Sequence, residues 1–293
     1  MANTKAVSQV KENEVAEVSD DELAQLVAQN TKLQERELIG NGVQPDYILL
    51  AKPATKALKK NEKELYIPKL KIDDFFIQKD KRILGERLAV VPLMFMTVYN
   101  EKDGAGRDAK FIGKWSQEQA VQFPLVEGSY FDRQLPNGHI LSPSNWAVVE
   151  VLKAKFNEDG EFVKVLGIED IKFGVVAYKS TGSRIWKAWK DDVKKRSGAS
   201  ATLIYTLFSD TYENDKGDWT DVNFSYTANL LEKDKNVAVA CLKKSNELRE
   251  ALQNALLIQR HDLSALMPLK PAVAQIEDAS TVEDSTDEEE LGF

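Results

Sequence analysis

Apolar residues near the N-terminus recur at helical spacing. Ser19 and Glu22 have the spacing of a capping box, a motif that marks the start of a helix. The apolar positions that follow continue almost to Gly40: Leu23, Leu26, Val27, Leu33 and Leu38. We therefore expect a helix over about 20–38. It either docks on the body of the protein or pairs with a second copy, and docking is the simpler alternative.

Residues from Tyr47 onward follow a pattern typical of strands. Alternating or continuous apolar runs predict strands at 66–72, 88–99, 145–156, 161–166, 172–177, 201–209 and 219–226. Pro92 lies inside the second run and predicts an edge position or a β-bulge, because proline has no N–H to donate. Turn residues at 158–160 and 214–218 predict two hairpins.

Two helical segments accompany these strands. Ser183 and Gly198 bracket one helix, Ser183–Arg196, and a second is expected over about 242–262. Trp186, Trp189 and Val193 share one side of the first helix, a stripe expected to face the core. Many short strands with few helices predict a β-rich α+β protein, an OB-like barrel with added helices.

Composition excludes several classes of protein. Hydrophobic residues make up 43% of the chain, enough for a sizeable core, and no apolar run reaches the ~18 residues of a membrane span. No secretory signal is visible, and the single cysteine favours a reducing compartment. One cysteine, Cys241, excludes an internal disulfide framework, and with only His139 and His261 it cannot complete a usual zinc site.

The net charge of −8 is unevenly distributed along the chain. Residues 277–293 contain eight acids and no base, whereas residues 40–276 carry a net charge of +4. The chain is therefore predicted to have three parts. These are an N-terminal arm and helix (1–40), a mildly basic body (41–266), and a flexible linker with a disordered acidic tail (267–293).

Motifs of the common enzyme classes are missing from the sequence. It has no phosphate-binding loop and no nucleophile elbow, and Gly104–Arg107 is better explained as the tip of a hairpin. His139 follows a turn and is expected to be simply exposed. We predict that the chain is not an enzyme and needs no cofactor or metal, although scattered carboxylates leave a two-metal nuclease as an alternative.

Two segments are strongly basic. Residues 52–87 contain eleven bases and six acids, and residues 179–196 contain seven bases and two acids, so each carries +5. Such surfaces suit nucleic-acid phosphates, because binding releases condensed counterions; a solvated lysine-rich face is the alternative. The candidate phosphate contacts are Lys69, Lys71, Lys81, Arg82, Lys179, Arg184, Lys187, Lys190 and Lys194.

Aromatic residues near turns add candidates for base stacking. Phe111, Trp115, Tyr130, Phe131 and Trp146 could form a platform for unpaired bases, and core packing is the alternative for each. We select Trp115, Tyr130 and Trp146 as candidate DNA-binding residues.

The tail ends with acids, an apolar residue and a terminal phenylalanine. A free carboxylate beside an aromatic ring is a compact ligand for a pocket with a basic rim. The candidate partner-binding residues are Asp287, Glu288, Glu289, Glu290, Leu291 and Phe293.

This tail, after a body with basic segments, resembles the single-stranded-DNA-binding proteins of bacterial and bacteriophage replication. Segments 66–71 and 180–189 are also similar to a group of tailed-bacteriophage proteins, as are Val90–Leu93, Tyr205–Leu207 and the hairpin at 214–219. The resemblance implies an OB-type barrel that binds single strands. It also implies a tail that recruits replication proteins such as polymerase or helicase.

These features together predict a single-stranded-DNA-binding protein of phage DNA replication and recombination. It would coat single strands in the cytoplasm of an infected bacterial host cell, and its tail would compete for the DNA-binding groove. Homo-oligomerisation stays open. The alternatives are a phage interaction or transcription-associated protein that lacks a DNA groove, and a metal-dependent nuclease.

Overall fold

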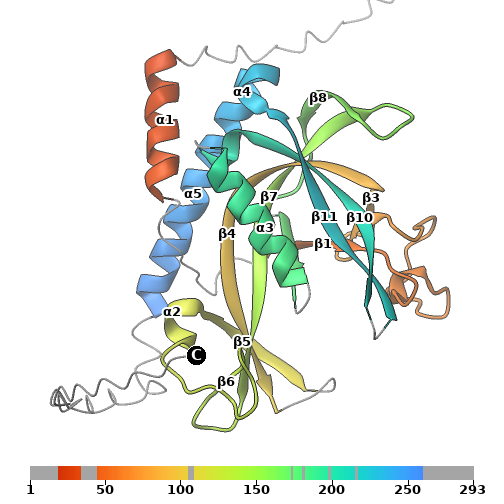
Figure 1. Ribbon diagram of the computed structural model, residues 1–293, viewed down its shortest axis with the longest axis vertical. Coiled ribbons are helices and arrows are strands. Elements are labelled where there is room, and N and C mark those ends of the chain that lie inside the picture. Colours follow the sequence, from red (N-terminus) through yellow and green to blue (C-terminus); the bar gives the residue numbers. More distant parts are fainter. Residues whose placement is uncertain are drawn as a thin grey trace, which may run out of the picture.

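The computed structural model shows a strand-rich protein (Figure 1). It describes residues 19–33, 45–104, 109–172, 174–179, 182–196, 199–214 and 217–259. The predicted arm before residue 19 and the predicted linker and tail at 267–293 lie outside these residues, so the expected disorder of the tail stays a prediction.

Within the described residues, one mixed sheet contains eleven strands. Its main path runs β11 (Gly217–Asn229), β10 (Leu203–Asn214), β4 (Arg87–Asp103), β7 (Ile140–Phe156), β9 (Gly174–Tyr178), β1 (Asp46–Leu50), β2 (Phe75–Ile77) and β3 (Arg82–Gly85). Off this path, β5 (Lys110–Ser116) pairs with β4, and both β6 (Arg133–Gln134) and β8 (Phe162–Ile168) pair with β7. All of these pairs are antiparallel except β1 with β9.

The predicted barrel is not closed. No pairing joins β11 to β3, the two ends of the path, in the part of the chain that the structure describes. The long strands β4 and β7 pair along most of their length, but other strands flank them over only part of it. β10 pairs with β4 at Arg87–Val90 and β5 pairs with it at Val98–Asp103, which leaves a gap on that side. The sheet therefore stays open.

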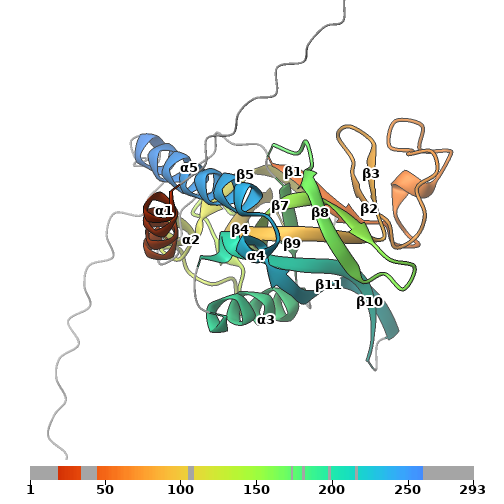
Figure 2. The ribbon, with the colours of Figure 1, turned by 90° about the horizontal axis from the view of Figure 1, so that it is seen from above.

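Helices cover both faces of this sheet (Figure 2). On one face lies α3 (Gly182–Lys195), and Trp186, Trp189 and Val193 are buried there, which confirms the predicted core-facing stripe. On the other face lies α5 (Lys235–Gln259), which contributes Cys241 and Leu242 to a second apolar cluster. Four short elements complete the described part of the fold: α2 (Gln117–Ala120), α4 (Leu230–Lys233) and the 3₁₀ turns Lys56–Leu58 and Ser200–Thr202.

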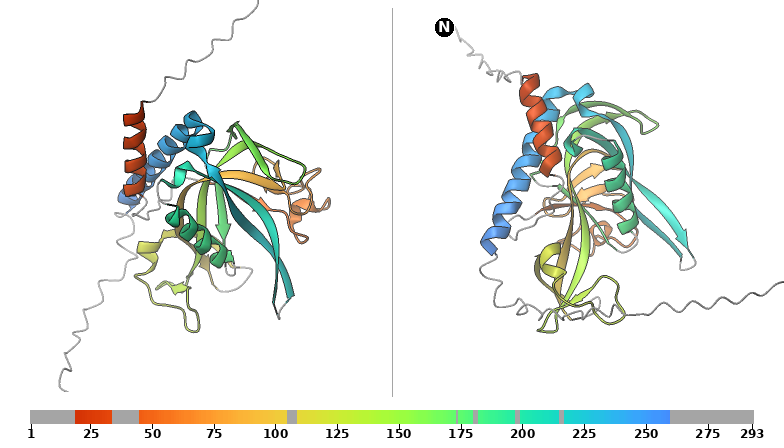
Figure 3. Two further views of the ribbon diagram at one scale, coloured as in Figure 1. Left: turned by 45° about the horizontal axis from the view of Figure 1, so that its top comes forward. Right: turned by 60° about the vertical axis from the view of Figure 1, so that its left-hand side comes forward.

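The N-terminal helix docks on the body, as the simpler alternative predicted. It is α1 (Asp20–Leu33), and the Ser19 hydroxyl accepts a hydrogen bond from the backbone N–H of Glu22 at 3.2 Å. The Lys243 ammonium of α5 lies 3.3 Å from the Glu22 carboxylate. Figure 3 shows α1 beside α5 in both views. Residues 34–38 of the predicted helix lie outside the described residues.

Two helices begin earlier in the chain than predicted. Helix α3 begins at Gly182, and Ser183 lies inside its first turn, where its hydroxyl accepts from the Asn145 amide at 3.0 Å. Helix α5 begins seven residues earlier than expected, at Lys235. The carboxylate of Asp234 accepts from the Val237 N–H at 3.0 Å, which is the geometry of an N-cap.

The strand predicted at 66–72 is wrong. This segment forms turns, and Lys69 has a φ of 69°, which no strand tolerates. Ile67 and Leu70 instead pack with Ala51, Ala57 and Phe76 in a small separate cluster. We call residues 51–72 the basic knob, because their seven lysines and two glutamates give a net charge of +5.

The proline in β4 produces the predicted bulge. The register between β4 and β7 shifts between Pro92 and Met94, in the gap between β10 and β5. The Leu93 carbonyl accepts from Arg249 Nη2 at 2.8 Å and from the Ser245 hydroxyl at 2.9 Å. Side chains of α5 thus replace the missing neighbouring strand. Both predicted hairpins are also confirmed, since β7 pairs with β8 and β10 with β11.

Candidate nucleic-acid interface

The outer side of α3 is basic. Arg184, Lys187, Lys194 and Lys195 are exposed there, because the apolar stripe of the helix faces the sheet. Lys190 is half-buried, and its ammonium lies 5.0 Å from the centre of the Trp186 ring. Lys179 is exposed just before the helix. Of the predicted phosphate contacts in this segment, all but Lys190 therefore face solvent.

Aromatic packing fixes the position of α3. Trp186 Nε1 donates to the Trp146 carbonyl at 2.9 Å, and the Trp189 ring stacks on Phe224 with centroids 5.6 Å apart. Phe95 of β4 makes edge contacts with both tryptophans. These contacts hold the helix rigidly, so its basic side chains lie in one fixed row.

Asp192 holds the C-terminal end of α3 in place. Its carboxylate accepts from Arg196 Nε at 2.7 Å and from the Tyr205 hydroxyl at 2.8 Å. Burial opposes ionisation of Asp192, but these bonds outweigh burial and lower its pKa. Burial also raises the pKa of Tyr205 well above its usual range, so that hydroxyl stays a donor.

The lower end of the sheet in Figure 1 carries a separate small lobe. It consists of α2, the segment 121–135, and strands β5 and β6, and its core includes Tyr99, Phe123 and Leu141. Trp115 lies inside this core, and its Nε1 donates to the Glu101 carboxylate at 2.7 Å. The lobe is therefore an independent apolar cluster beyond the end of α3.

Two predicted stacking residues are buried. Trp115 and Trp146 are each 4% exposed. Trp115 packs edge-on against Phe123, and the Trp146 ring is covered by the Lys114 ammonium at 4.9 Å and by Tyr47. Neither ring presents a face to solvent, because each belongs to an apolar cluster. Both residues therefore leave the candidate set.

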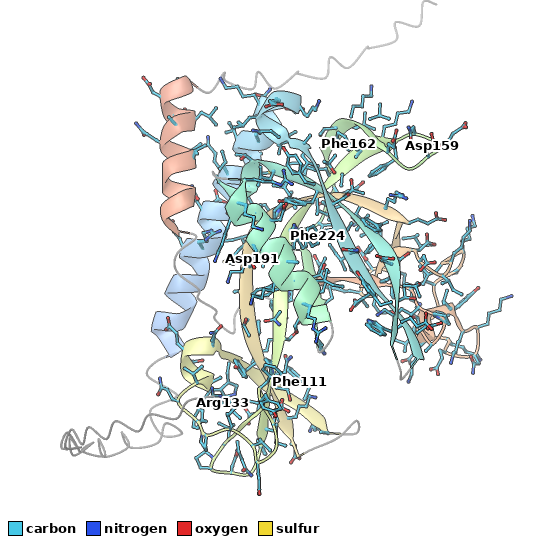
Figure 4. The ribbon with its side chains drawn as sticks, in the orientation of Figure 1. Phe111, Arg133, Asp159, Phe162, Asp191 and Phe224 are labelled. Atoms are coloured by element: carbon cyan, nitrogen blue, oxygen red, sulfur yellow. The ribbon has the colours of Figure 1, made fainter. Side chains whose placement is uncertain are left out.

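Three other aromatic rings are exposed on the lobe. Tyr130 is 88% exposed, Phe131 69% and Phe111 54%, and the ring centroids of Tyr130 and Phe131 lie 6.4 Å apart. Phe111 pairs with Lys102 of β4 and so points to the other face of the sheet from Tyr99. We call Tyr130 and Phe131 the aromatic platform. Arg133 shapes the loop that carries them by donating to the Phe123 carbonyl at 2.8 Å. Figure 4 shows Phe111 and Arg133 in this lobe.

The lobe and α3 lie on the same face of the sheet. Phe95, Thr97 and Tyr99 alternate along β4 and so point to one side. Phe95 contacts the tryptophans of α3, whereas Tyr99 lies in the core of the lobe.

The N-terminal end of α3 is the end nearer the lobe. Thr97 donates to Asn145, which donates in turn to Ser183 in the first turn of the helix. On β7, residue 140 pairs with strand β6 of the lobe, and Asn145, which contacts α3, lies five residues further along the strand. Five residues of strand span about 17 Å. One nucleic-acid strand can span that distance.

The remaining predicted bases lie in and beside the basic knob. Lys69, Lys71 and Lys81 are exposed, and Lys69 and Lys81 have left-handed φ values of 69° and 54°. Arg82 is engaged within the chain: Nη1 donates to the Asp170 carbonyl at 2.8 Å, and Nη2 lies 3.1 Å from the Asp80 carboxylate. Three of these four residues are thus free to meet a partner.

His139 is not simply exposed, as the sequence suggested. Its Nδ1 lies 2.6 Å from a Glu101 carboxylate oxygen, and its Nε2 lies 3.7 Å from Asp103. Sequence reasoning missed this contact because Glu101 precedes His139 by 38 residues. Within the described ranges, no three His, Cys, Asp or Glu side chains gather in a group that could hold a metal ion.

A cavity of about 620 Å³ lies between the start of β4 and the β7–β8 hairpin. Its lining contains one base, Arg87, and several carboxylates: Asp74, Glu86, Glu158, Asp159 and Glu169. Such a lining repels phosphate, so the cavity is a poor site for nucleic acid.

Comparisons with known proteins add no relative. No protein-family model, curated protein or solved structure matches this chain. Of the helices that the structure describes, none combines the length and the apolar character needed to cross a bilayer. The predicted partner-binding residues of the tail lie outside the described residues.

Proposed function

We propose that this protein binds single-stranded DNA on the face of the sheet that carries α3 and the lobe. The observation that carries the proposal is a lobe with two adjacent exposed rings, Tyr130 and Phe131, whose core lies on the same face of the sheet as α3 with its basic row. Phosphates would contact Lys179 and the basic row of α3 (Arg184, Lys187, Lys194 and Lys195), while unpaired nucleobases would stack on the aromatic platform.

Large exposed aromatic rings are unusual on a surface that needs no partner. The exposed side chains of the lobe also include Ile112, Val121 and Leu125, which extend the apolar area around the platform. Every base offers a π-face, so stacking favours single strands of any sequence. A duplex hides those π-faces, so it would contact only the basic side chains of α3.

The architecture is compatible with an OB-like mode of binding. OB folds are five-stranded, partly open barrels that hold oligonucleotides on an antiparallel face. The strongly paired strands β4 and β7 would supply such a face here. The OB-like character of the body is part of this proposal. The open sheet is the structural feature that supports it best.

The wider role that we propose follows from the tail. The protein would coat single strands during phage DNA replication and recombination in the cytoplasm of the infected host. Its acidic tail, ending at Phe293, would recruit a polymerase or helicase. Binding rather than catalysis is the proposed activity.

The test is a titration of fluorescently labelled oligonucleotides, single-stranded and duplex, with and without Mg²⁺. We expect retention of the single strand, weaker binding of duplex, and no cleavage. No retention would favour the alternative of an interaction protein without a DNA groove, and metal-dependent cleavage would favour the alternative of a nuclease. Equal affinity for single-stranded and duplex DNA would refute base stacking on the aromatic platform.

A double variant tests the platform itself. Tyr130→Ala with Phe131→Ala removes two rings, and each lost stack of about 1–3 kcal/mol should weaken binding by roughly 5- to 150-fold. Val163→Ala with Leu166→Ala on β8 is the matched control, since these apolar side chains are also exposed. An equal effect of both pairs would contradict the assignment.

A further inference from the structure

The hairpin of β10 and β11 extends beyond the rest of the sheet. Strand β10 pairs with β4 only as far as Phe208, whereas its pairing with β11 continues to Asn214 and Gly217. We call residues 209–222 the acidic arm. Figures 1 and 3 show its two strands projecting from the body. A two-stranded ribbon without a third strand is marginally stable alone, so its projection suggests a partner.

The arm is strongly charged. Residues 210–221 contain five acids (Asp210, Glu213, Asp215, Asp218 and Asp221) and one base, Lys216, which gives a net charge of −4. Like charges this close together repel one another, and a cationic partner surface would relieve that repulsion.

An aromatic pair accompanies these acids. Tyr212 and Trp219 stack across the two strands, with centroids 5.7 Å apart and planes 21° from parallel. Both side chains are only half-buried. Tyrosine and tryptophan are the residues most often found as energetic anchors of protein interfaces, and their faces also attract lysine ammonium groups.

The basic knob lies beside the arm. Lys52 Nζ of the knob is 3.8 Å from an Asp221 carboxylate oxygen of the arm. The exposed lysines of the knob are Lys56, Lys59, Lys60, Lys63, Lys69 and Lys71. Ile72 is exposed at the same place and adds an apolar contact. One surface of the molecule thus carries a cluster of +5 next to a cluster of −4.

Two adjacent clusters of opposite charge form a self-complementary surface. A two-fold axis between two copies would place each arm against the other copy's knob, so that both contacts form at once and the assembly closes. We propose that the acidic arm and the basic knob form a docking surface for a second copy of this chain, and that the protein is a dimer.

Nucleic acid is a poorer occupant of this surface. A polyanion lying on the knob would run beside the four negative charges of the arm. A second copy avoids that repulsion and uses the arm as well as the knob. This inference goes beyond the proposed DNA binding and does not depend on it.

The oligomeric state of the full chain, measured without DNA, tests the proposal. Analytical ultracentrifugation at low salt should give twice the chain mass of 32.9 kDa. Since charge pairs hold the surface together, moderate salt should shift the equilibrium toward monomer. A monomer at low salt, or a series of larger species, would overturn the two-fold dimer. Because no DNA is present, these results are independent of the proposed function.

Charge reversal identifies the surfaces. An arm-reversed variant (Glu213→Lys, Asp215→Lys, Asp218→Lys) changes the arm from −4 to +2. A knob-reversed variant (Lys56→Glu, Lys60→Glu, Lys63→Glu) changes the knob from +5 to −1. Each variant alone should be monomeric, because its arm and knob then have the same sign.

Mixing the two variants separates docking from misfolding. In a mixed pair, each arm again meets a knob of opposite sign, so an equimolar mixture should recover the dimer. A matched triple change of exposed lysines on β7 and β8 (Lys153→Glu, Lys155→Glu, Lys164→Glu) should leave the dimer intact. Dimeric single variants, a monomeric mixture, or a control as disruptive as the knob variant would each refute the proposal.

Discussion

The proposed role of α3 can be tested through the salt dependence of DNA binding. Four exposed basic residues form the outer row of α3: Arg184, Lys187, Lys194 and Lys195. Each phosphate contact on a single strand contributes a slope of about −0.7 in a plot of log affinity against log salt. If all four contact phosphates, α3 alone contributes about −2.8, and raising salt from about 50 to 200 mM weakens binding roughly 50-fold.

The perturbation is Lys187→Gln with Lys194→Gln. Both side chains are exposed, and Trp186, Trp189 and Val193 hold the helix from the opposite side. The contribution of α3 to the slope should fall to about −1.4, so the same rise in salt should weaken binding through α3 only about 7-fold. Neutral glutamine keeps much of the side-chain length and the helix propensity of lysine.

Fluorescence anisotropy of a labelled oligonucleotide at several salt concentrations measures both slopes. Lys153→Gln with Lys155→Gln on β7 is the matched control, because these exposed lysines lie at the other end of the sheet. A slope unchanged by the α3 variant would refute the assignment of phosphates to this helix. An equal change of slope in the control would show that binding depends only on nonspecific attraction by net charge.

Three further predictions concern the buried charge, the strained turn and the tail. Lys244→Met would leave the buried carboxylate of Glu150 without its cation. The free energy of unfolding, measured by urea titration, should fall by about 3–5 kcal/mol. Adding Glu150→Gln to this variant should restore stability. Burial raises the pKa of Glu150, although Lys244 opposes this, so the proton binds more tightly in the folded state. Stability from this group should therefore fall as pH rises above the unfolded pKa of 4.5, and the Glu150→Gln variant should lack that part of the pH dependence. Lys81 occupies a left-handed turn position, so Lys81→Gly should raise stability by about 0.5–1 kcal/mol in thermal unfolding; a loss of stability would contradict the strain argument. Deletion of 277–293 should tighten DNA binding, most of all at low salt, whereas Phe293→Ala should leave it nearly unchanged; weaker binding after the deletion would refute competition by the tail.

Local patterns in the sequence determined many elements of this fold. The i, i+3, i+7 spacing of Trp186, Trp189 and Val193 predicted the buried face of α3, and the structure confirms it. The N-cap at Ser19 and the bulge at Pro92 were also predicted correctly. Each of these features depends on residues only a few positions apart, where helical or strand geometry fixes the neighbours.

Only the tertiary structure decided which side chains are available for binding. Trp115 and Tyr130 have similar local surroundings in the sequence, yet one is buried in the lobe and the other is exposed. Their difference depends on Glu101 and Phe123 meeting Trp115, and on the loop that carries Tyr130 leaving the core. Residue type and spacing carry no information about such contacts.

The sequence by itself determined a strand-rich protein with a basic body, a core-facing tryptophan helix and an acidic C-terminal segment. The open sheet, the exposed aromatic platform on the lobe, and the acidic arm next to the basic knob were decided by the tertiary structure. The physical reason is that these features require strands distant in the chain to pair in a particular register. That register depends on the joint packing of both faces of the sheet, which no local periodicity specifies.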